Sequence, residues 1–165
     1  MKRCKTTTEC GVTYVEILVV TGIVAILFAF VYVSLLNVKP TASLQTTITS
    51  LASDLRQQQM KAMIGDTEGR ATTDTYGIYF QPTSYVLFHG ASYAPLDTSN
   101  FVVNLDDNLQ FSSISLPSSS IIFAKGSGEV VGYSASQNTV TLRNTASGTT
   151  KTFQFNVYGS LVQVN

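Results

Sequence analysis

Apolar residues dominate positions 12–36 of the 165-residue chain. Residues 17–36 are 20 consecutive positions without a charge or a proline, and Glu16 is the only charged residue between Glu9 and Lys39. At a rise of about 1.5 Å per residue, a helix of that length spans roughly 30 Å, the thickness of the hydrocarbon core of a bilayer. The pattern therefore predicts a membrane-spanning helix.

The helical pattern continues beyond this run with a different periodicity. Between residues 23 and 64 the only glycine or proline is Pro40, where we expect a kink or a boundary within a long helix. Gly65 is typical of a C-terminal stop, with Lys61 in the last turn. Apolar residues at spacings of four, three and four form one face of an amphipathic helix over 41–64: Leu44, Ile48, Leu51 and Leu55.

From residue 75 onward the apolar period changes to two. Tyr76, Ile78 and Phe80 alternate with smaller or polar residues, and a turn at 81–84 leads into a second apolar run, which indicates a hairpin. Further short runs lie at 101–105, 109–111, 121–123, 130–131, 139–143, 151–157 and 161–164. About eight short strands with turns between them predict one antiparallel β domain.

The fold class that these patterns predict is α+β, with a long N-terminal helix packed on an antiparallel β-sheet domain. The β-rich region, 75–165, is long enough to bury a core if the amphipathic half of the helix covers it. We expect the four apolar residues of the helix face to pack against six strand residues: Ile78, Phe80, Val140, Leu142, Phe153 and Phe155.

The segment before the apolar run is short and basic. Residues 1–11 read MKRCKTTTECG, with three positive charges from Lys2, Arg3 and Lys5 against Glu9. Such a bias holds a leader on the cytoplasmic side of a membrane. An ordinary secretory signal peptide is the alternative, and the small residues 41–43 could then form its cleavage site. Against it, the apolar run exceeds the about 7–15 residues of a signal-peptide core.

Gly11, the residues VTYVE and the apolar run together resemble the N-terminal signal of type IV pilins and type II secretion pseudopilins. In that family a prepilin peptidase cuts after the glycine and methylates the new N-terminus, and a glutamate stands fifth in the mature chain. The resemblance implies cleavage between Gly11 and Val12, N-methylation of Val12, and a role in assembly for Glu16. Phenylalanine is the usual first residue, so Val12 departs from the pattern.

The second half of the chain resembles, more loosely, the globular part of GspH/FimT-type minor pseudopilins. The segments that carry this resemblance are YGIYFQPTSYVLFHG, IIFAKGSGEV, TVTLR and KTFQFNVYGSLVQV. In that family a phenylalanine-glycine segment precedes two final strands and a glycine turn. Four residues fit this pattern: Phe123, Gly126, Gly128 and Gly159.

The resemblance implies three parts: a cleaved leader at 1–11, a transmembrane and assembly segment at 12–39, and a globular domain at 40–165. Cleavage would leave 165 − 11 = 154 residues and remove both cysteines, Cys4 and Cys10. The charge would become (10 − 3) − (10 − 1) = −2, which is no electrostatic footprint for nucleic acid. We therefore expect little or no DNA binding.

The function implied is that of a non-enzymatic structural subunit without a cofactor. It would be held in the inner membrane by one helix, with the globular domain outside the cytoplasm, and would then enter a periplasmic or cell-surface filament or its tip. The expected partners are the prepilin peptidase, other pilin or pseudopilin subunits, the inner-membrane assembly platform and the lipid bilayer. The alternative is a single-pass anchored β domain that binds a ligand or partner and never polymerises.

Glu16 and a stripe of small residues are the candidate assembly residues. The Glu16 carboxylate would pair with the α-amino group of Val12 on a neighbouring subunit, since an unpaired buried charge costs about 3–5 kcal/mol. Alternatively, Glu16 is solvated at headgroup level. Small residues at spacings of three and four form a stripe: Gly22, Ala25 and Ala29. Such a stripe lets membrane helices approach closely. Alternatively, the small residues only fill space among larger ones.

Other candidate chemistry is sparse. His89 is the only histidine and has no cysteine near it in the sequence. Asp97, Asp106 and Asp107 could hold a calcium ion, although turn-forming aspartates are the simpler interpretation. Residues 125–128 lack the phosphate-loop pattern, and no serine lies in G-x-S-x-G. An anchored hydrolase is therefore the least supported function, because no nucleophile and base can be paired.

Overall fold

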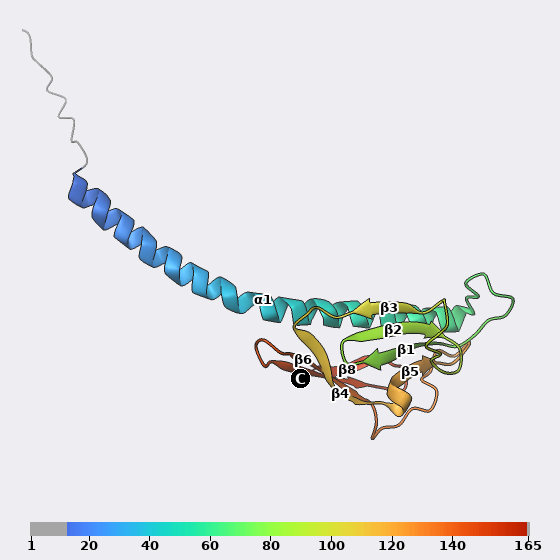
Figure 1. Cartoon of the computed structure of the whole chain (residues 1–165). Helices are drawn as coiled ribbons and strands as arrows, with labels where there is room; N and C mark the ends of the chain where they lie inside the picture. Colours follow the sequence, from blue (N-terminus) through green and yellow to red (C-terminus); the bar gives the residue numbers. More distant parts are fainter. Residues whose placement is uncertain (1–12, 165) are drawn as a thin grey trace, which may run out of the picture. The chain divides into compact units, whose positions relative to one another are not determined.

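The computed structural model describes residues 13–164, without side-chain detail for 33–42, 163 and 164. Gly11, Val12 and both cysteines lie outside the described residues, so the predictions made for them stay predictions. The chain divides into two compact units, Met1–Lys39 and Pro40–Asn165, and each is described by itself below. Figure 1 shows the ribbon with its helix and strands labelled.

The predicted long helix is present as α1, Tyr14–Ile64. The assigned helix continues through Pro40, and the division between the two units falls directly before that residue. The helix ends as predicted at Gly65, which has a φ of +67°. The Asp66 amide donates to the Lys61 carbonyl oxygen at 3.0 Å, which is the six-to-one hydrogen bond of a Schellman cap.

The β region forms two four-stranded antiparallel sheets, where we predicted one. The first has the strand order β3-β2-β1-β5 and comprises β1 Tyr76–Gln81, β2 Ser84–His89, β3 Phe101–Asn104 and β5 Ser120–Phe123. The second has the order β4-β6-β7-β8 and comprises β4 Leu109–Ser115, β6 Thr139–Asn144, β7 Thr150–Phe155 and β8 Leu161–Val164. A 3₁₀ turn, Pro117–Ser119, lies between β4 and β5.

The chain changes sheets at the turn between β3 and β4. These two strands are close in sequence, yet β3 pairs with β2 and β4 pairs with β6. Backbone hydrogen bonds from Leu105 to Thr83 and from Phe111 to Pro82, at 3.0 and 2.8 Å, bring both strands to the β1–β2 turn. The run at 130–131 contributes only a single bridge, between Val130 and Phe123.

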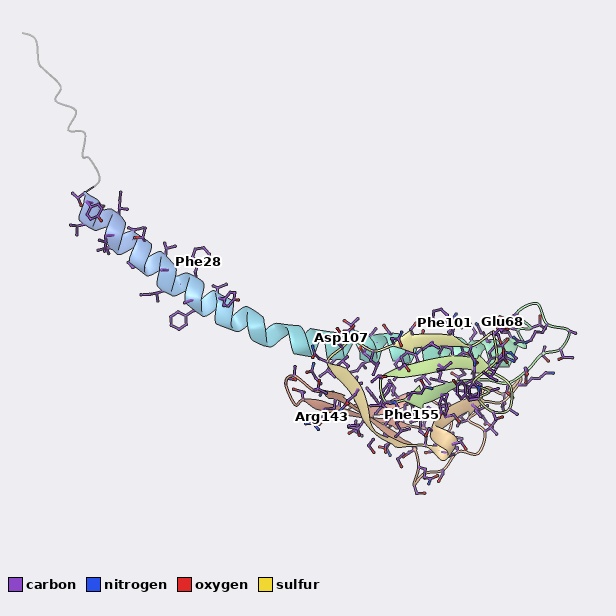
Figure 2. The ribbon with its side chains drawn as sticks, in the orientation of Figure 1. Phe28, Glu68, Phe101, Asp107, Arg143 and Phe155 are labelled. Atoms are coloured by element: carbon purple, nitrogen blue, oxygen red, sulfur yellow. The ribbon has the colours of Figure 1, made fainter. Side chains whose placement is uncertain are left out.

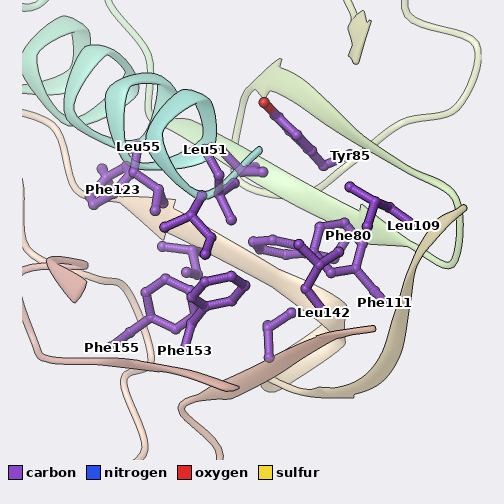
Figure 3. Close-up of a cluster of buried hydrophobic side chains, with 14 of the residues drawn as sticks. Leu51, Leu55, Phe80, Tyr85, Leu109, Phe111, Phe123, Leu142, Phe153 and Phe155 are labelled. Atoms are coloured by element: carbon purple, nitrogen blue, oxygen red, sulfur yellow. The ribbon is translucent and has the colours of Figure 1, made fainter. Parts of the chain in front are cut away.

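Helix and sheets share one core, shown in Figure 3. The predicted core residues are confirmed: all four leucine or isoleucine residues of the helix face and all six predicted strand residues are buried. Phe80 of β1 lies against Phe111 of β4 in an edge-on contact with ring centroids 5.3 Å apart, and 6.4 Å from Phe155 of β7. Phe80 therefore joins the inner faces of the two sheets.

Three glycines in the loops after β5 and before β8 allow close packing near the C-terminal end of α1 and against β5. Gly159 has a φ of +67°, and a Cβ there would lie 2.5 Å from the Phe123 ring. A Cβ on Gly128, with a φ of +68°, would lie 2.5 Å from Met63. The Gly126 amide donates to the Ala62 carbonyl at 3.0 Å. Gly128 and Gly159 thus combine a backbone conformation that disfavours other residues with close contacts that leave no room for a side chain.

We predict that residues 40–165 fold alone as a monomer and that Leu51→Ala or Leu55→Ala lowers their free energy of unfolding by about 2–5 kcal/mol. Both side chains are almost wholly buried in the shared core, so each substitution leaves a cavity. Urea unfolding checks this, with Ser50→Ala on the exposed side of the same helix as the control. A loss below about 0.5 kcal/mol at both leucines would contradict the assigned core.

A pair of glycine substitutions separates backbone strain from steric contact. Gly132 also has a positive φ, +65°, but a Cβ there would meet nothing within 4 Å. Gly132→Ala should therefore cost about 1–2 kcal/mol, the penalty of a left-handed alanine. Gly159→Ala should cost about 1–3 kcal/mol more, because Phe123 must also move. Equal losses in urea unfolding would show that Phe123 does not pack against Gly159.

Candidate functional site

The first described turn of α1 contains Glu16. Thr13 caps the helix, since its side-chain oxygen accepts from the Glu16 amide at 3.3 Å and its carbonyl accepts from the Glu16 and Ile17 amides at 3.1 and 3.2 Å. The sequence T-x-x-E at 13–16 is the capping-box pattern, a signal that the sequence analysis did not use. Glu16 itself is exposed, at the end of the helix where a negative charge favours the helix dipole.

The segment Tyr14–Tyr32 is long and apolar enough to cross a membrane, by length and composition, with a mean hydropathy of 2.5. All of its residues are exposed within the described chain, including Phe28, whose side chain is 70% exposed and is labelled in Figure 2. The Thr21 hydroxyl donates to the carbonyls of Ile17 and Leu18 at 2.9 and 3.0 Å. The polar group in the middle of the segment is thus satisfied by its own helix, as an apolar environment requires.

Gly22, Ala25 and Ala29 lie on one side of this helical segment, because their spacings of three and four match its turn. All three are exposed, and a Cβ on Gly22 would meet nothing within 4 Å. The stripe is therefore an exposed part of the segment 14–32. Whether a neighbouring helix packs there stays a prediction.

The structure brings His89 next to Asp97, whereas Asp106 has other contacts. His89 lies between two carboxylates, with Nδ1 3.5 Å from Asp74 and Nε2 3.2 Å from Asp97. Asp106 accepts a hydrogen bond from the Ser43 hydroxyl of α1. Within residues 13–164, no group of His, Cys, Asp or Glu side chains has the arrangement of a metal site, so the predicted calcium possibility gains no support.

A pocket of about 420 Å³ lies between the last turns of α1 and strands β2 and β3. Figure 2 labels two of its lining residues, Phe101 on β3 and Glu68 in the loop after α1. The pocket combines polar groups from the helix with aromatic and aliphatic groups from the strands. Its lining residues are Asp54, Gln57, Gln58, Lys61, Glu68, Tyr76, Leu87, Phe88, His89, Ser99 and Phe101.

A network of charges closes one side of this pocket. Glu68 accepts hydrogen bonds from Lys61 at 2.5 Å and from Arg70 at 3.1 Å. Arg70 also donates to the Tyr76 hydroxyl at 2.8 Å, and both cations lie 5.7 Å from the centre of the Tyr76 ring. Partial burial raises the pKa of Glu68, but the hydrogen bonds and charges of Lys61 and Arg70 together have the larger effect. The pKa of Glu68 is therefore below its ordinary value.

Asp54 and Gln58 line the pocket from α1, one turn of the helix apart. The Tyr85 hydroxyl donates to Asp54 Oδ2 at 2.6 Å. Burial and the neighbouring carboxylate raise the pKa of Tyr85 above its ordinary value, so this hydroxyl stays a donor. Gln58 is only 3% exposed, and its buried Oε1 accepts no hydrogen bond from any described residue.

Gln58 continues the apolar stripe of α1, and the sequence analysis missed it. The buried positions of the helix are 44, 48, 51, 55, 58 and 62, at spacings of four, three, four, three and four. A polar residue at the fifth of these positions was the available signal, since a leucine would complete the pattern there. The face predicted from the sequence extends only from Leu44 to Leu55.

Comparison of the chain with family models, with curated proteins and with solved structures found no match.

We predict that Glu68→Gln lowers stability at neutral pH by less than about 1 kcal/mol, as is usual for a partly exposed ion pair. The pKa of Glu68 in the folded protein is below the ordinary value of 4.5, so its ionised carboxylate stabilises the fold at pH values above 4.5. This contribution is lost as the pH falls through the folded-state pKa. Urea unfolding of residues 40–165 should therefore show a difference between variant and parent at pH 7 that shrinks below pH 4.5.

Glu129→Gln is the matched control, because no ion pair is formed by Glu129 within the described part of the chain. A Glu68→Gln difference that is the same at pH 7 and at pH 3 would contradict an electrostatic role for this residue.

Proposed function

We propose that this chain is a structural minor pilin or pseudopilin subunit of a type IV pilus or type II secretion machine. It is cut after Gly11 by a prepilin peptidase, methylated at Val12, and assembled through its N-terminal helix into a filament or its tip. The observation that carries the proposal is the composition of α1: one helix has exposed apolar residues at Tyr14–Tyr32 and a buried stripe from Leu44 onward.

This arrangement supports the proposal because each half of the helix needs a different environment. Apolar side chains on every face are stable in lipid or among other apolar helices. The stripe beginning at Leu44 belongs to the core of the β-rich unit, so the same element also forms part of a folded domain. An α+β domain with such a helix is the architecture that the sequence resemblance implies.

In this proposal Glu16 fixes the register between neighbouring subunits. Removal of the leader creates a free amino group on Val12, four residues before Glu16. In an apolar surrounding, a carboxylate and an amine each cost free energy unless they are paired, so helices assemble where the two groups meet. Gly22, Ala25 and Ala29 then let the helices approach closely.

The proposed location follows from the charges of the leader. Its basic residues stay in the cytoplasm, the helix crosses the inner membrane, and the β-rich unit lies outside. There the subunit meets the assembly platform and the other subunits before it leaves the bilayer for the filament.

Mass spectrometry of the N-terminus of the protein isolated from membranes tests this function. A chain that begins with methylated Val12 is the expected result. A chain that begins at Met1, or after Ala42 or Ser43, would contradict it. The first of those results favours the alternative function, an anchored β domain that binds a ligand or partner without polymerising, and the second favours an ordinary signal peptide.

We predict different failures for two substitutions at the junction. Gly11→Val should block cleavage, because a bulky residue hinders the extended backbone that a peptidase must grip. The uncut protein should stay in the membrane with its basic leader. Glu16→Ala should be cut normally and stay in the membrane unassembled, since it retains the junction and loses the partner of the Val12 amine. Chain length on gels and filament fractionation measure the two steps.

Glu9→Ala is the control, because it also removes one carboxylate but lies in the segment that is cut away. It should be processed and assembled like the parent. If Glu16→Ala assembles as well as the parent, the ion pair has no role in this subunit, and Glu16 is a solvated charge at the membrane edge.

A further inference from the structure

We propose that the pocket between α1 and strands β2 and β3 binds an organic cation, an alkylammonium or alkylguanidinium group, between Asp54 and Gln58. The cation belongs either to a free amine or to a lysine or arginine side chain of a partner chain. The inference is independent of the proposed function, because it uses only residues of the β-rich unit and of the part of α1 that belongs to its core.

The first observation is the unsatisfied acceptor of Gln58. A buried amide oxygen without a donor costs about 1–3 kcal/mol, and a leucine at this position of the stripe would avoid that cost. Gln58 is nevertheless 97% buried and lines the pocket. A ligand with N–H groups in the pocket would supply this donor after a rotation of the Gln58 amide that turns the buried Oε1 toward the pocket.

The second observation is the charge of Asp54. This carboxylate lies on the same face of α1 as Gln58, one turn earlier, so both can contact one group. One of its oxygens accepts from the Tyr85 hydroxyl, which is a neutral donor. No cation within the described residues lies within ion-pair distance of Asp54. The pocket therefore contains a negative charge that a cationic ligand would neutralise.

The cations nearest the pocket already have partners. Lys61 and Arg70 both bind Glu68, and His89 lies between Asp74 and Asp97. Among the residues that line the pocket, Lys61 is the one permanent cation, and Asp54 and Glu68 are the two carboxylates. This balance disfavours an anion and favours a second cation.

The strands supply a surface for the carbon chain of the ligand. Leu87 and Phe101 line the pocket, and the Phe101 side chain is 64% exposed. Phe101 lies on β3, an edge strand of its sheet, and no further described strand pairs with β3 on its outer side. An alkyl chain of a few methylene groups can lie on these side chains while its charged end reaches Asp54 and Gln58.

The binding test uses the full chain in a non-ionic detergent, which carries no competing cation, and three probes. Agmatine represents a free amine, acetyl-Gly-Arg-Gly-amide represents a side chain of a partner, and acetyl-Gly-Gln-Gly-amide is the neutral control. Titration followed by NMR of the side-chain amides, together with calorimetry, measures each affinity. At least one cationic probe should bind at least 10-fold more tightly than the neutral peptide, and more weakly at high salt.

Two variants locate the site. Gln58→Leu and Asp54→Asn should each lower the affinity for that cation at least 10-fold, whereas Asp107→Asn, which removes an exposed carboxylate outside the pocket, should leave it unchanged. Gln58→Leu should not lower the midpoint of thermal unfolding, because it removes an unsatisfied acceptor from a core position. That stability readout separates a lost contact from a lost fold.

The outcomes decide both the site and the source of the cation. Binding of agmatine alone supports a free amine as the ligand. Binding of the arginine peptide alone supports a side chain of a partner chain. Binding of both probes supports a site that accepts a cation from either source. Equal binding of the neutral peptide, no binding of either cation, or unchanged affinity in Gln58→Leu and Asp54→Asn would overturn the proposal.

Discussion

The packing of one helix face into the β-rich unit is the contact on which the rest of this structure depends. Leu51 and Leu55 of α1 lie in a cluster that also contains Phe80 of the first sheet and Phe153 of the second. Each sheet has only four strands, and several strands are four residues long. Because sheets of this size bury little area alone, the helix supplies apolar surface that both need. The pocket lies beside this shared core, since Tyr76 belongs to both.

The N-terminal part of the same helix, in contrast, has apolar side chains that no core buries. Its apolar side chains at 14–32 are exposed, so water would surround them unless lipid or other helices do. Contiguous exposed apolar surface of this extent marks a membrane or protein contact. The capping threonine and the internally bonded Thr21 hydroxyl leave few polar groups unsatisfied there, which suits an apolar environment.

The sequence predicted the elements of this fold well because their signals are local. The leucine stripe, the stop at Gly65 and the alternation in β1 each depend on residues a few positions apart. The division into two sheets could not be predicted in this way, since the pairing of β4 with β6 joins residues about 30 positions apart. The alternation of apolar and polar residues in a short strand does not indicate which other strand will pair with it.

The candidate sites differ in the same respect. Glu16 and the small-residue stripe follow from spacing along one helix, and the sequence alone could place them. The pocket could not be placed, because Gln58, His89 and Phe101 come from three separate elements that only the tertiary fold brings together. Its one local signal was a glutamine at a stripe position, and a single polar residue there is common enough to be passed over. The contact of His89 with Asp97 likewise depends on the path of the loop after β2, and its contact with Asp74 depends on the pairing of β1 with β2.

A spin-label accessibility scan along α1 tests most directly whether one helix has two environments. Single labelled cysteines would be placed at 18–31 and at 44–62 in full-length protein in lipid bilayers, with Cys4 and Cys10 replaced by serine. We predict that dissolved oxygen, which concentrates in lipid, reaches labels on all faces of 18–31. At 44–62 a water-soluble reagent should reach the labels with a helical period and be excluded at positions 48, 51, 55 and 58. Equal access of the water-soluble reagent to 18–31 and to the exposed face of 44–62 would contradict the membrane-spanning role of this helix.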